Sequence, residues 1–206
     1  PGIQSGFEHV DLSEVTGNGA ADITGTKVAN TITGTLNGDV IRPGKGNDTI
    51  TPGRGADTIE LSTGQDHINT DEIEGIAATA TSLADGSAAN TKTITFGNGV
   101  DTITGFGAGA SGDIIDSAEV GSSLPAELTT LTNIGSAPTN TAYIDYGSWN
   151  AATKVFTISS GAFNATTNND AIVLFTNGAD AAGVLAGTGH ILLPDLTAAL
   201  HADNFV

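Results

Sequence analysis

Acidic side chains recur at intervals of nine residues in the first third of the chain. The repeated aspartates are Asp39, Asp48, Asp57 and Asp66, and Asn30 stands at the equivalent place one interval earlier. Carboxylate and amide oxygens are ligands for hard cations such as Ca²⁺, which also accepts backbone carbonyl groups. Glycine-rich turns expose such carbonyls, and the turns that precede these aspartates contain Gly44, Gly46, Gly53, Gly55 and Gly64. The residue types and their spacing therefore predict a row of calcium sites.

The aspartates belong to six consecutive nine-residue blocks that run from residue 16 to residue 69. The eighth position of every block is isoleucine, at Ile23, Ile32, Ile41, Ile50, Ile59 and Ile68. A helix needs apolar residues every three or four positions, so this spacing excludes a helix. In the block PGKGNDTIT, the glycines allow a sharp turn with positive φ, and TIT suits a strand whose isoleucine points inward. We expect each block to form a loop and then a short strand.

Stacking of the blocks follows from their length. Two blocks make one coil of about 18 residues, so every second block should lie parallel to the first, about 4.8 Å away. The isoleucines then form two facing ladders, one of Ile23, Ile41 and Ile59 and the other of Ile32, Ile50 and Ile68. The predicted core is therefore a thin apolar seam.

The same stacking places the acidic residues in two rows, Ala21, Asp39 and Asp57 in one and Asn30, Asp48 and Asp66 in the other. Two carboxylates one coil apart repel each other by about 3 kcal/mol at an effective dielectric constant near 20, so a cation is needed between them. The best predicted sites lie between Asp39 and Asp57 and between Asp48 and Asp66. Asn30 with Asp48 makes a weaker third site, since an amide oxygen is neutral.

The blocks PGKGNDTIT and PGRGADTIE resemble the nonapeptide G-G-x-G-x-D-x-U-x of the repeats-in-toxin (RTX) proteins. Pro43 and Pro52 replace the first glycine, Leu61 and Ser62 replace both glycines of the next block, and Asn37 stands where a later glycine would be. The segment FEHVDLSEV resembles the lead-in found before many such repeats. The resemblance implies a parallel β-roll, Ca²⁺-dependent folding and export by a type I (one-step) secretion system.

The pattern is interrupted after Asn69 and then resumes. We expect an insertion or cap over residues 75–93, after a lead-in and roll over residues 1–74. In FGNGVDTITGF, Gly99, Asp101 and Ile103 return at the equivalent positions, and in GAGASGDIIDS an apolar pair is flanked by Asp113 and Asp116. These segments resemble the last repeats of RTX rolls. Turn formation and metal ligation are equally compatible with Asp101, Asp113 and Asp116.

In the segment 94–206, we expect the resumed roll to be followed by an antiparallel β module, because stretches of alternating apolar residues are separated there by Gly/Asn turns. A hairpin should close around residues 150–153, with Trp149 in or beside the core. Two short helical stretches are expected after residue 177, the second capped by Asp195. The predicted fold class is all-β: a parallel β-roll followed by a β-rich module with one or two short helices.

The last four residues, Asp203, Asn204, Phe205 and Val206, resemble the secretion-signal endings of RTX proteins. A final strand that closes the sheet is an alternative for the same residues, and both can hold at once. The opening PGIQSGFEHV lacks Met and the pattern of a signal peptide, so we expect a fragment or processed product with a C-terminal export address.

Composition excludes several classes of function. Six Lys and Arg stand against 23 Asp and Glu, and the net charge of −17 repels nucleic acid and anionic bilayers. No apolar run is long enough for membrane insertion. The chain has no cysteine, its four histidines are dispersed, and no catalytic motif occurs, so we expect neither a zinc site nor an enzyme.

Two classes of function remain. One is a Ca²⁺-binding structural module at the bacterial cell surface or outside the cell, in a surface layer, matrix fibre or adhesin, with homo-oligomeric assembly as a lattice or fibre. The other is the C-terminal export and folding module of a larger secreted hydrolase or toxin. Both imply the type I secretion machinery as a partner.

Overall fold

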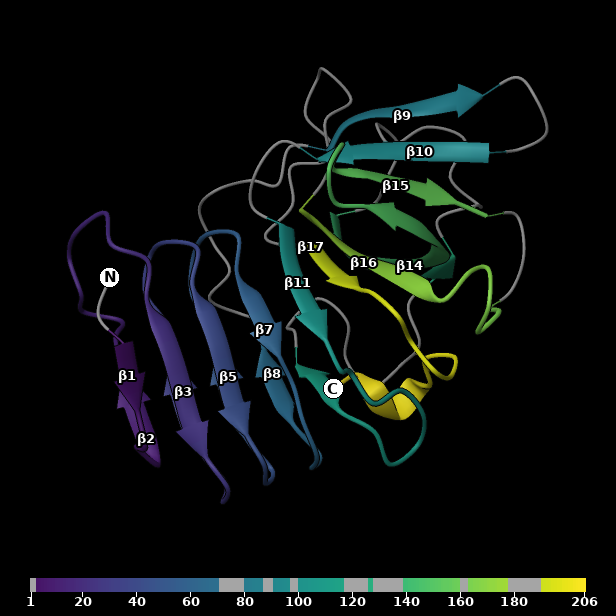
Figure 1. The fold of residues 1–206 in the computed structure, drawn as a ribbon. Helices are drawn as coiled ribbons and strands as arrows, with labels where there is room; N and C mark the ends of the chain where they lie inside the picture. Colours follow the sequence, from purple (N-terminus) through teal and green to yellow (C-terminus); the bar gives the residue numbers. More distant parts are fainter. Residues whose placement is uncertain are drawn as a thin grey trace.

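The computed structural model describes residues 3–70, 80–86, 91–96, 100–116, 126–127, 139–159, 163–177 and 190–206. These residues form one sheet of twelve strands and one of five (Figure 1). The all-β fold class predicted from the repeats is confirmed.

Short parallel strands at the N-terminal side alternate between the two sheets, so the chain winds as a β-roll. The first sheet contains β1 (Ile3–Ser5), β3 (Asp22–Thr26), β5 (Val40–Gly44), β7 (Thr58–Glu60) and β11 (Val100–Thr104). The second contains β2 (His9–Asp11), β4 (Thr31–Thr33), β6 (Thr49–Thr51), β8 (His67–Asn69) and β12 (Ile114–Asp116). Each predicted block is a loop followed by one of these strands.

The core of the roll is the predicted pair of isoleucine ladders. Strand pairing aligns Ile23, Ile41, Ile59 and Ile103 in one sheet and Val10, Ile32, Ile50, Ile68 and Ile115 in the other. The isoleucines are at most 1% exposed. Both ladders are confirmed, and Ile103 shows that the repeat resumes after the interruption.

Close stacking of the loops explains their glycines. Gly44 and Gly46 have φ of 101° and 116°, as the sequence predicts. A Cβ atom on Gly44 would overlap the backbone oxygen of Thr26 in the loop one coil earlier. Any larger residue at this position would therefore push two coils apart.

The twelve-stranded sheet continues beyond the roll into an antiparallel module (Figure 1). Strand β17 (His190–Leu193) lies parallel to β11 and antiparallel to β16 (Asp170–Asn177). The sheet then runs through β14 (Thr139–Asn150), β15 (Val155–Ile158), β10 (Thr91–Phe96) and β9 (Ala80–Gly86), and β13 (Ala126–Glu127) pairs with β14. The antiparallel strands predicted for the later part of this region are confirmed, whereas β9 and the first half of β10 lie in residues 75–93, which were expected to be an insertion or cap and instead pair with this sheet.

The β14–β15 hairpin closes where expected, because Asn150 pairs with Val155 and its side chain accepts the backbone N–H groups of Ala152 and Thr153. Trp149 packs against a second apolar cluster, which also contains Phe156. Trp149 is therefore a partly buried core aromatic, as predicted.

The helix expected to begin at Asp195 is wrong. Asp195 lies in a turn with φ of 57°, and its N–H donates to the Asp170 carboxylate, while the N–H of Leu196 donates to the Asn169 carbonyl. These contacts with another loop use the amides that would begin a helix. The segment instead ends in a 3-10 turn, η3 (Ala202–Asn204). The other expected helical stretch falls mostly on residues 178–189, outside the described residues.

Within the described ranges, no helix has the length and apolar character needed to cross a bilayer.

Candidate metal centre

Loops of alternate blocks lie at two edges of the roll and carry the sixth-position residues that the repeat predicts. One row contains Ala21, Asp39, Asp57 and Asp101, and the other contains Asn30, Asp48, Asp66 and Asp113. Their polar members are at most 3% exposed. The structure therefore brings together the repeat aspartates and two of the three later ones.

One carboxylate oxygen of each aspartate is used to hold the coils in register. Oδ1 of Asp57 accepts the backbone N–H of Asp39 at 2.6 Å, and Oδ1 of Asp101 accepts that of Asp57 at 2.8 Å. In the other row, Asp66 accepts from Asp48 at 2.9 Å. Asp39, Asp48 and Asp113 make the same contact one coil earlier, to Ala21, Asn30 and Asp66. Each aspartate thus fixes the loop next to its own.

The second carboxylate oxygen divides the aspartates into two groups. In the open group, Oδ2 is buried and has no hydrogen-bond partner in the structure: Asp48, Asp57, Asp66 and Asp101. In the closed group, the loop supplies an N–H: Thr35 donates to Asp39 at 2.6 Å, and Gly107 donates to Asp113 at 2.7 Å. A buried oxygen without a donor or a cation is costly, so the open group requires a partner.

The charges of these groups are strongly affected by burial. Burial raises the pKa of Asp66 to about 6. It also raises the pKa of Asp57 and Asp101, and the neighbouring Asp101 carboxylate raises that of Asp57 further. The pKa of Asp48 and that of Asp113 are raised by burial too. In the folded chain, these carboxyl groups therefore favour a proton or a nearby positive charge.

The open oxygens fit a hard cation. Ca²⁺ takes six to eight oxygen ligands and accepts backbone carbonyls as readily as carboxylates. No group of three acidic or histidine side chains converges in the part of the chain that the structure describes. A cation here would therefore combine the open Oδ2 atoms with loop carbonyls, for which Gly44, Gly46, Gly53, Gly55 and Gly64 provide tight turns.

Two predicted ligands lie differently from expectation. The Asn30 side chain is closed within its own loop, since its Oδ1 accepts the N–H of Thr26 at 2.7 Å. Asp116 lies on the strand β12 rather than in a loop, and its Oδ2 is 3.0 Å from Nε2 of His67. The alternation of side chains across a strand places both residues of this pair on the outer face. Asp116 therefore does not join either row.

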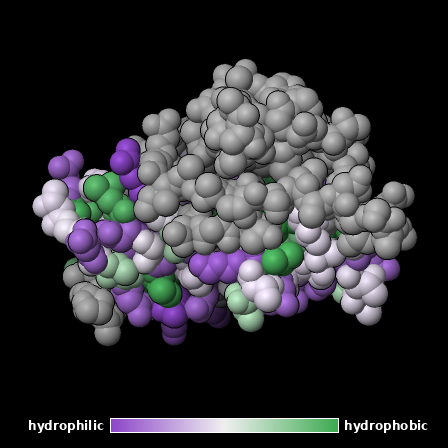
Figure 2. All heavy atoms as spheres, turned by 90° about the horizontal axis from the view of Figure 1, so that it is seen from above, coloured by the Kyte–Doolittle hydropathy of each residue, from purple (hydrophilic) through white to green (hydrophobic). Residues whose placement is uncertain are grey.

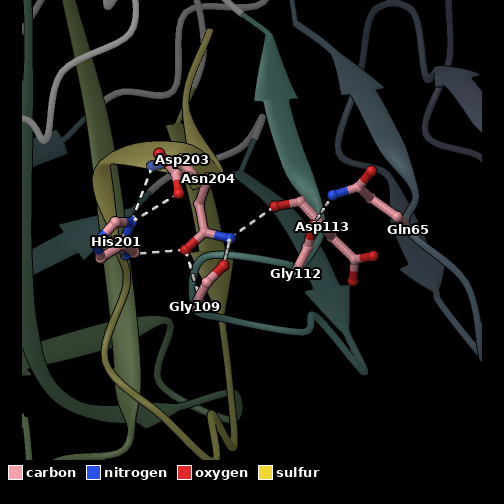
Figure 3. A network of polar contacts seen from close by, with 7 residues as sticks. All are labelled: Gln65, Gly109, Gly112, Asp113, His201, Asp203 and Asn204. Carbon is pink, nitrogen blue, oxygen red and sulfur yellow. Dashed lines mark hydrogen bonds and ion pairs between the residues drawn. The ribbon is translucent and has the colours of Figure 1, made fainter.

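The final residues pack against the last coil of the roll (Figure 3). Asn204 is fully buried, and its Nδ2 donates to the carbonyls of Gly109 and Asp113 at 3.0 and 2.8 Å. Its Oδ1 accepts the N–H groups of Gly109 and His201 at 3.0 and 2.8 Å. Asn204 thus ties η3 to the loop that holds Asp113.

Phe205 is fully buried and forms a parallel bridge with Ile115, while the N–H of Val206 donates to the Ile115 carbonyl at 3.1 Å. The side chain of Asp203 is 58% exposed. The final strand expected as an alternative does not form: these residues meet the sheet through a single bridge from Phe205 to β12. Their role as a secretion signal stays a prediction.

Sequence reasoning missed the threonines that close two of the loops. Thr26 and Thr35 each stand four residues before Asn30 or Asp39, and each donates its N–H to that side chain. The signal was present as T-x-x-x-N and T-x-x-x-D, a spacing that lets a turn fold back on an oxygen acceptor.

No protein-family model matches the chain. No curated protein matches it either. Among solved structures, the chain is similar to the solution structure of the AlgE6R3 subunit from the Azotobacter vinelandii mannuronan C5-epimerase, with 22% identity and a TM-score of 0.32. The alignment covers 95% of this chain and 82% of that one.

Proposed function

We propose that this chain is a Ca²⁺-binding structural module whose folding is driven by Ca²⁺ outside the cell. The observation that carries the proposal is the set of four aspartates whose Oδ2 atoms are buried without a hydrogen-bond partner: Asp48, Asp57, Asp66 and Asp101. A bound cation would supply the positive charge that these carboxylates lack, and each open oxygen would occupy one of its coordination positions.

The chain's own residues explain why folding would depend on the cation. The isoleucine ladders give a core only one side chain wide in each sheet, and the glycine loops lose much backbone freedom on folding. At neutral pH, the buried carboxylates of adjacent coils repel each other across one coil. Folding without a cation would therefore require these groups to bind protons.

The setting we propose is a bacterial surface layer, matrix fibre or adhesin, reached by type I secretion. The low Ca²⁺ of the cytosol would leave the roll unfolded for passage, and the higher external concentration would fold it. We propose a structural role for the chain and no catalytic one. The aspartates close enough to act as catalytic pairs are the buried ones of the two rows, which the proposed Ca²⁺ sites already use.

Assembly into a lattice or fibre is the finer part of this proposal. The net charge of −17 opposes contact between copies unless divalent cations bridge them. On the face seen in Figure 2, hydrophilic residues cover most of the described surface, and hydrophobic ones form small separate groups. Such a surface favours contacts bridged by cations over apolar ones.

A Ca²⁺ titration followed by circular dichroism and isothermal calorimetry tests the proposal. We expect strand signal to appear with bound Ca²⁺ at free concentrations on the order of 10⁻⁴ to 10⁻³ M, as for other extracellular modules. Asp57→Asn should shift the midpoint to higher Ca²⁺. The matched control Asp116→Asn changes the charge equally but lies outside both rows, and it should leave the midpoint unchanged. A chain equally folded in excess chelator at neutral pH would contradict the proposal.

Light scattering and electron microscopy test assembly. Ordered particles in millimolar Ca²⁺ that dissolve in chelator would support the lattice or fibre. A chain that folds with Ca²⁺ but stays monomeric in millimolar Ca²⁺ would favour the alternative, in which the chain is the export and folding module of a larger secreted hydrolase or toxin.

A further inference from the structure

We propose that Thr26 and Thr35 take the place of a bound cation in their loops, so that Ca²⁺ binds only where a carboxylate oxygen is left open. The inference rests on the proposed function and narrows it to particular loops. Sequence alone treats Asp39 as one of the four best ligands, whereas the structure gives its oxygens other partners.

The loop of residues 34–39 is closed by Thr35. Its N–H donates to Oδ2 of Asp39 at 2.6 Å, and its hydroxyl donates to Oδ1 at 2.9 Å. The same hydroxyl accepts the N–H of Asn37 at 3.0 Å. Together with the Ala21 N–H at 2.7 Å, three donors point at this one carboxylate. Hydrogen-bond donors thus provide this carboxylate with the positive partners that a cation would otherwise provide.

The loop of residues 25–30 has the same closure with a neutral side chain. The N–H of Thr26 donates to Oδ1 of Asn30 at 2.7 Å, and Nδ2 of Asn30 donates to the Thr26 hydroxyl at 3.0 Å. Nδ2 also donates to the carbonyl of Phe7 at 3.2 Å. Both polar atoms of the amide are therefore satisfied without metal.

The loops before Asp48 and Asp57 differ from the closed ones at two positions, whereas the loop before Asp66 carries Ser62, a hydroxyl residue like threonine, at the first of them and glycine only at the second. Gly44 and Gly53 stand where Thr26 and Thr35 stand in the closed loops, with φ of 101° and 92°. Two residues later, the open loops carry glycine where the closed loops carry Val28 or Asn37, namely at Gly46, Gly55 and Gly64.

The amides of the open loops are directed at neighbouring coils instead of at the carboxylate. The N–H groups of Lys45 and Arg54 donate to the carbonyls of Thr26 and Thr35 at 3.0 and 3.1 Å, and that of Gly46 donates to the Thr63 carbonyl at 3.0 Å. Proline at the first position of two of these loops has no N–H to offer. The Oδ2 atoms of Asp48 and Asp57 are consequently left for a cation.

The fourth open residue, Asp101, follows a loop that lies partly outside the described residues, but its Oδ2 is equally unpartnered. In the loop before Asp113, the N–H of Gly107 closes the carboxylate at 2.7 Å. The structure therefore assigns Ca²⁺ ligation to Asp48, Asp57, Asp66 and Asp101, and it assigns hydrogen-bonded closure to Asn30, Asp39 and Asp113.

Counting bound Ca²⁺ tests this division, with native mass spectrometry and calorimetry in CaCl₂ as the two readouts. Asp57→Asn should bind fewer Ca²⁺ ions than the unaltered chain, whereas Asp39→Asn should bind the same number. Asn30→Asp adds a carboxylate at a row position yet should add no Ca²⁺, because the Thr26 N–H already donates to Oδ1 and the Thr26 hydroxyl, 3.0 Å from Nδ2 of Asn30, can donate to the new Oδ2 as the Thr35 hydroxyl donates to Asp39. The double change Thr35→Gly with Asn37→Gly opens the loop and should add one Ca²⁺ ion at Asp39.

The outcomes distinguish a failure of this inference from a failure of the proposed Ca²⁺-binding function. Loss of a Ca²⁺ ion from Asp39→Asn, or gain of one by Asn30→Asp, would overturn the division, because carboxylate position alone would then decide binding. Asn30→Asp serves as the second variant if Asp39→Asn fails to fold in Ca²⁺, since it keeps the side-chain size and the Oδ1 acceptor. An unaltered chain that binds no Ca²⁺ would instead remove the proposed function itself.

Discussion

Replacement of Asp66 by Asn should change stability in opposite directions with and without Ca²⁺. The amide oxygen of Asn can still accept the Asp48 N–H that Asp66 accepts at 2.9 Å, so the coil contact is kept and only the charge and the open oxygen are lost. The variant therefore separates the cost of burying a charge from the value of that charge as a metal ligand.

The expected change in the free energy of unfolding in chelator follows from the raised pKa of Asp66. Burial raises the pKa of Asp66 from 3.8 to about 6, and each unit corresponds to about 1.4 kcal/mol, so the ionised group costs the folded state about 3 kcal/mol. The cost is absent below the unfolded pKa, grows as the pH rises, and is complete above the folded pKa. At pH about 8, Asp66→Asn should remove up to this amount, and the gain should vanish near pH about 4.

The sign reverses in Ca²⁺. A site that binds only the folded chain contributes about 2.7 kcal/mol when free Ca²⁺ is about 100 times the dissociation constant, and the variant should lose most of that. Denaturant unfolding followed by circular dichroism measures both quantities. If the unaltered chain is unfolded in chelator at neutral pH, acidification should fold it by protonating the buried carboxylates. The pH midpoint of that folding transition is then measured in place of the denaturant midpoint, and it should be higher for the variant.

Asp116→Asn is the control, because it removes the same charge from the outer face of β12, where the side chain is 38% exposed. Its effect should stay within about 1 kcal/mol in both conditions, as for other exposed pairs. If Asp66→Asn destabilised the chain in chelator as much as in Ca²⁺, the reasoning about buried charge would be refuted.

Three further changes test the packing of the roll. Ile50→Ala removes a fully buried side chain from the centre of a ladder and should lower the free energy of unfolding in saturating Ca²⁺ by about 2 to 5 kcal/mol, whereas Thr49→Ala on the exposed face should cost much less; equal losses in denaturant unfolding would argue against the seam. Asn204→Ala leaves the N–H of Gly109 without its acceptor and removes a donor to the carbonyls of Gly109 and Asp113, so it should cost about 1 to 3 kcal/mol, with faster hydrogen exchange at Gly109; unchanged exchange would contradict this contact. Arg42→Ala breaks ion pairs to Asp22 and Glu60 on the half-exposed outer face, so it should shift stability by only about 0 to 1 kcal/mol in the same unfolding assay, and a larger loss would show that this face matters more than its exposure implies.

The isoleucine ladders could be predicted from the sequence because stacking at a fixed period leaves no choice of neighbour. Ile41 must meet Ile23 and Ile59 once every second block is parallel, and strand pairing aligns them in this way. The aspartate rows followed from the same argument. The partner of the second carboxylate oxygen of each aspartate could not be predicted in this way. It depends on the backbone conformation of the loop, which differs between Thr35 and Gly53 although they occupy the same position of the repeat.

Long-range contacts escaped prediction for a different reason. Strand β17 pairs with β11 across about ninety residues of intervening chain, and no local pattern marks that choice. Asp195 looked like a helix cap because it precedes apolar residues, but its neighbours are recruited by the loop around Asn169 and Asp170. Tertiary contacts therefore decided the structure wherever the nine-residue period ended.

The two ends of the roll are unlike each other, and this asymmetry makes growth of the roll directional. At one end, β17 covers the edge of β11 and Phe205 covers part of β12. At the other end, β1 and β2 each pair with a single strand among those described. The coils from β3 to β8 pair at a constant offset of 18 residues, so a further coil of that length among them would find the same backbone partners, whereas an extra coil after β11 and β12 would have to displace the antiparallel module. Variation in the number of repeats is therefore expected to be tolerated before β11 and not after β12, as in a polymer with one blocked terminus.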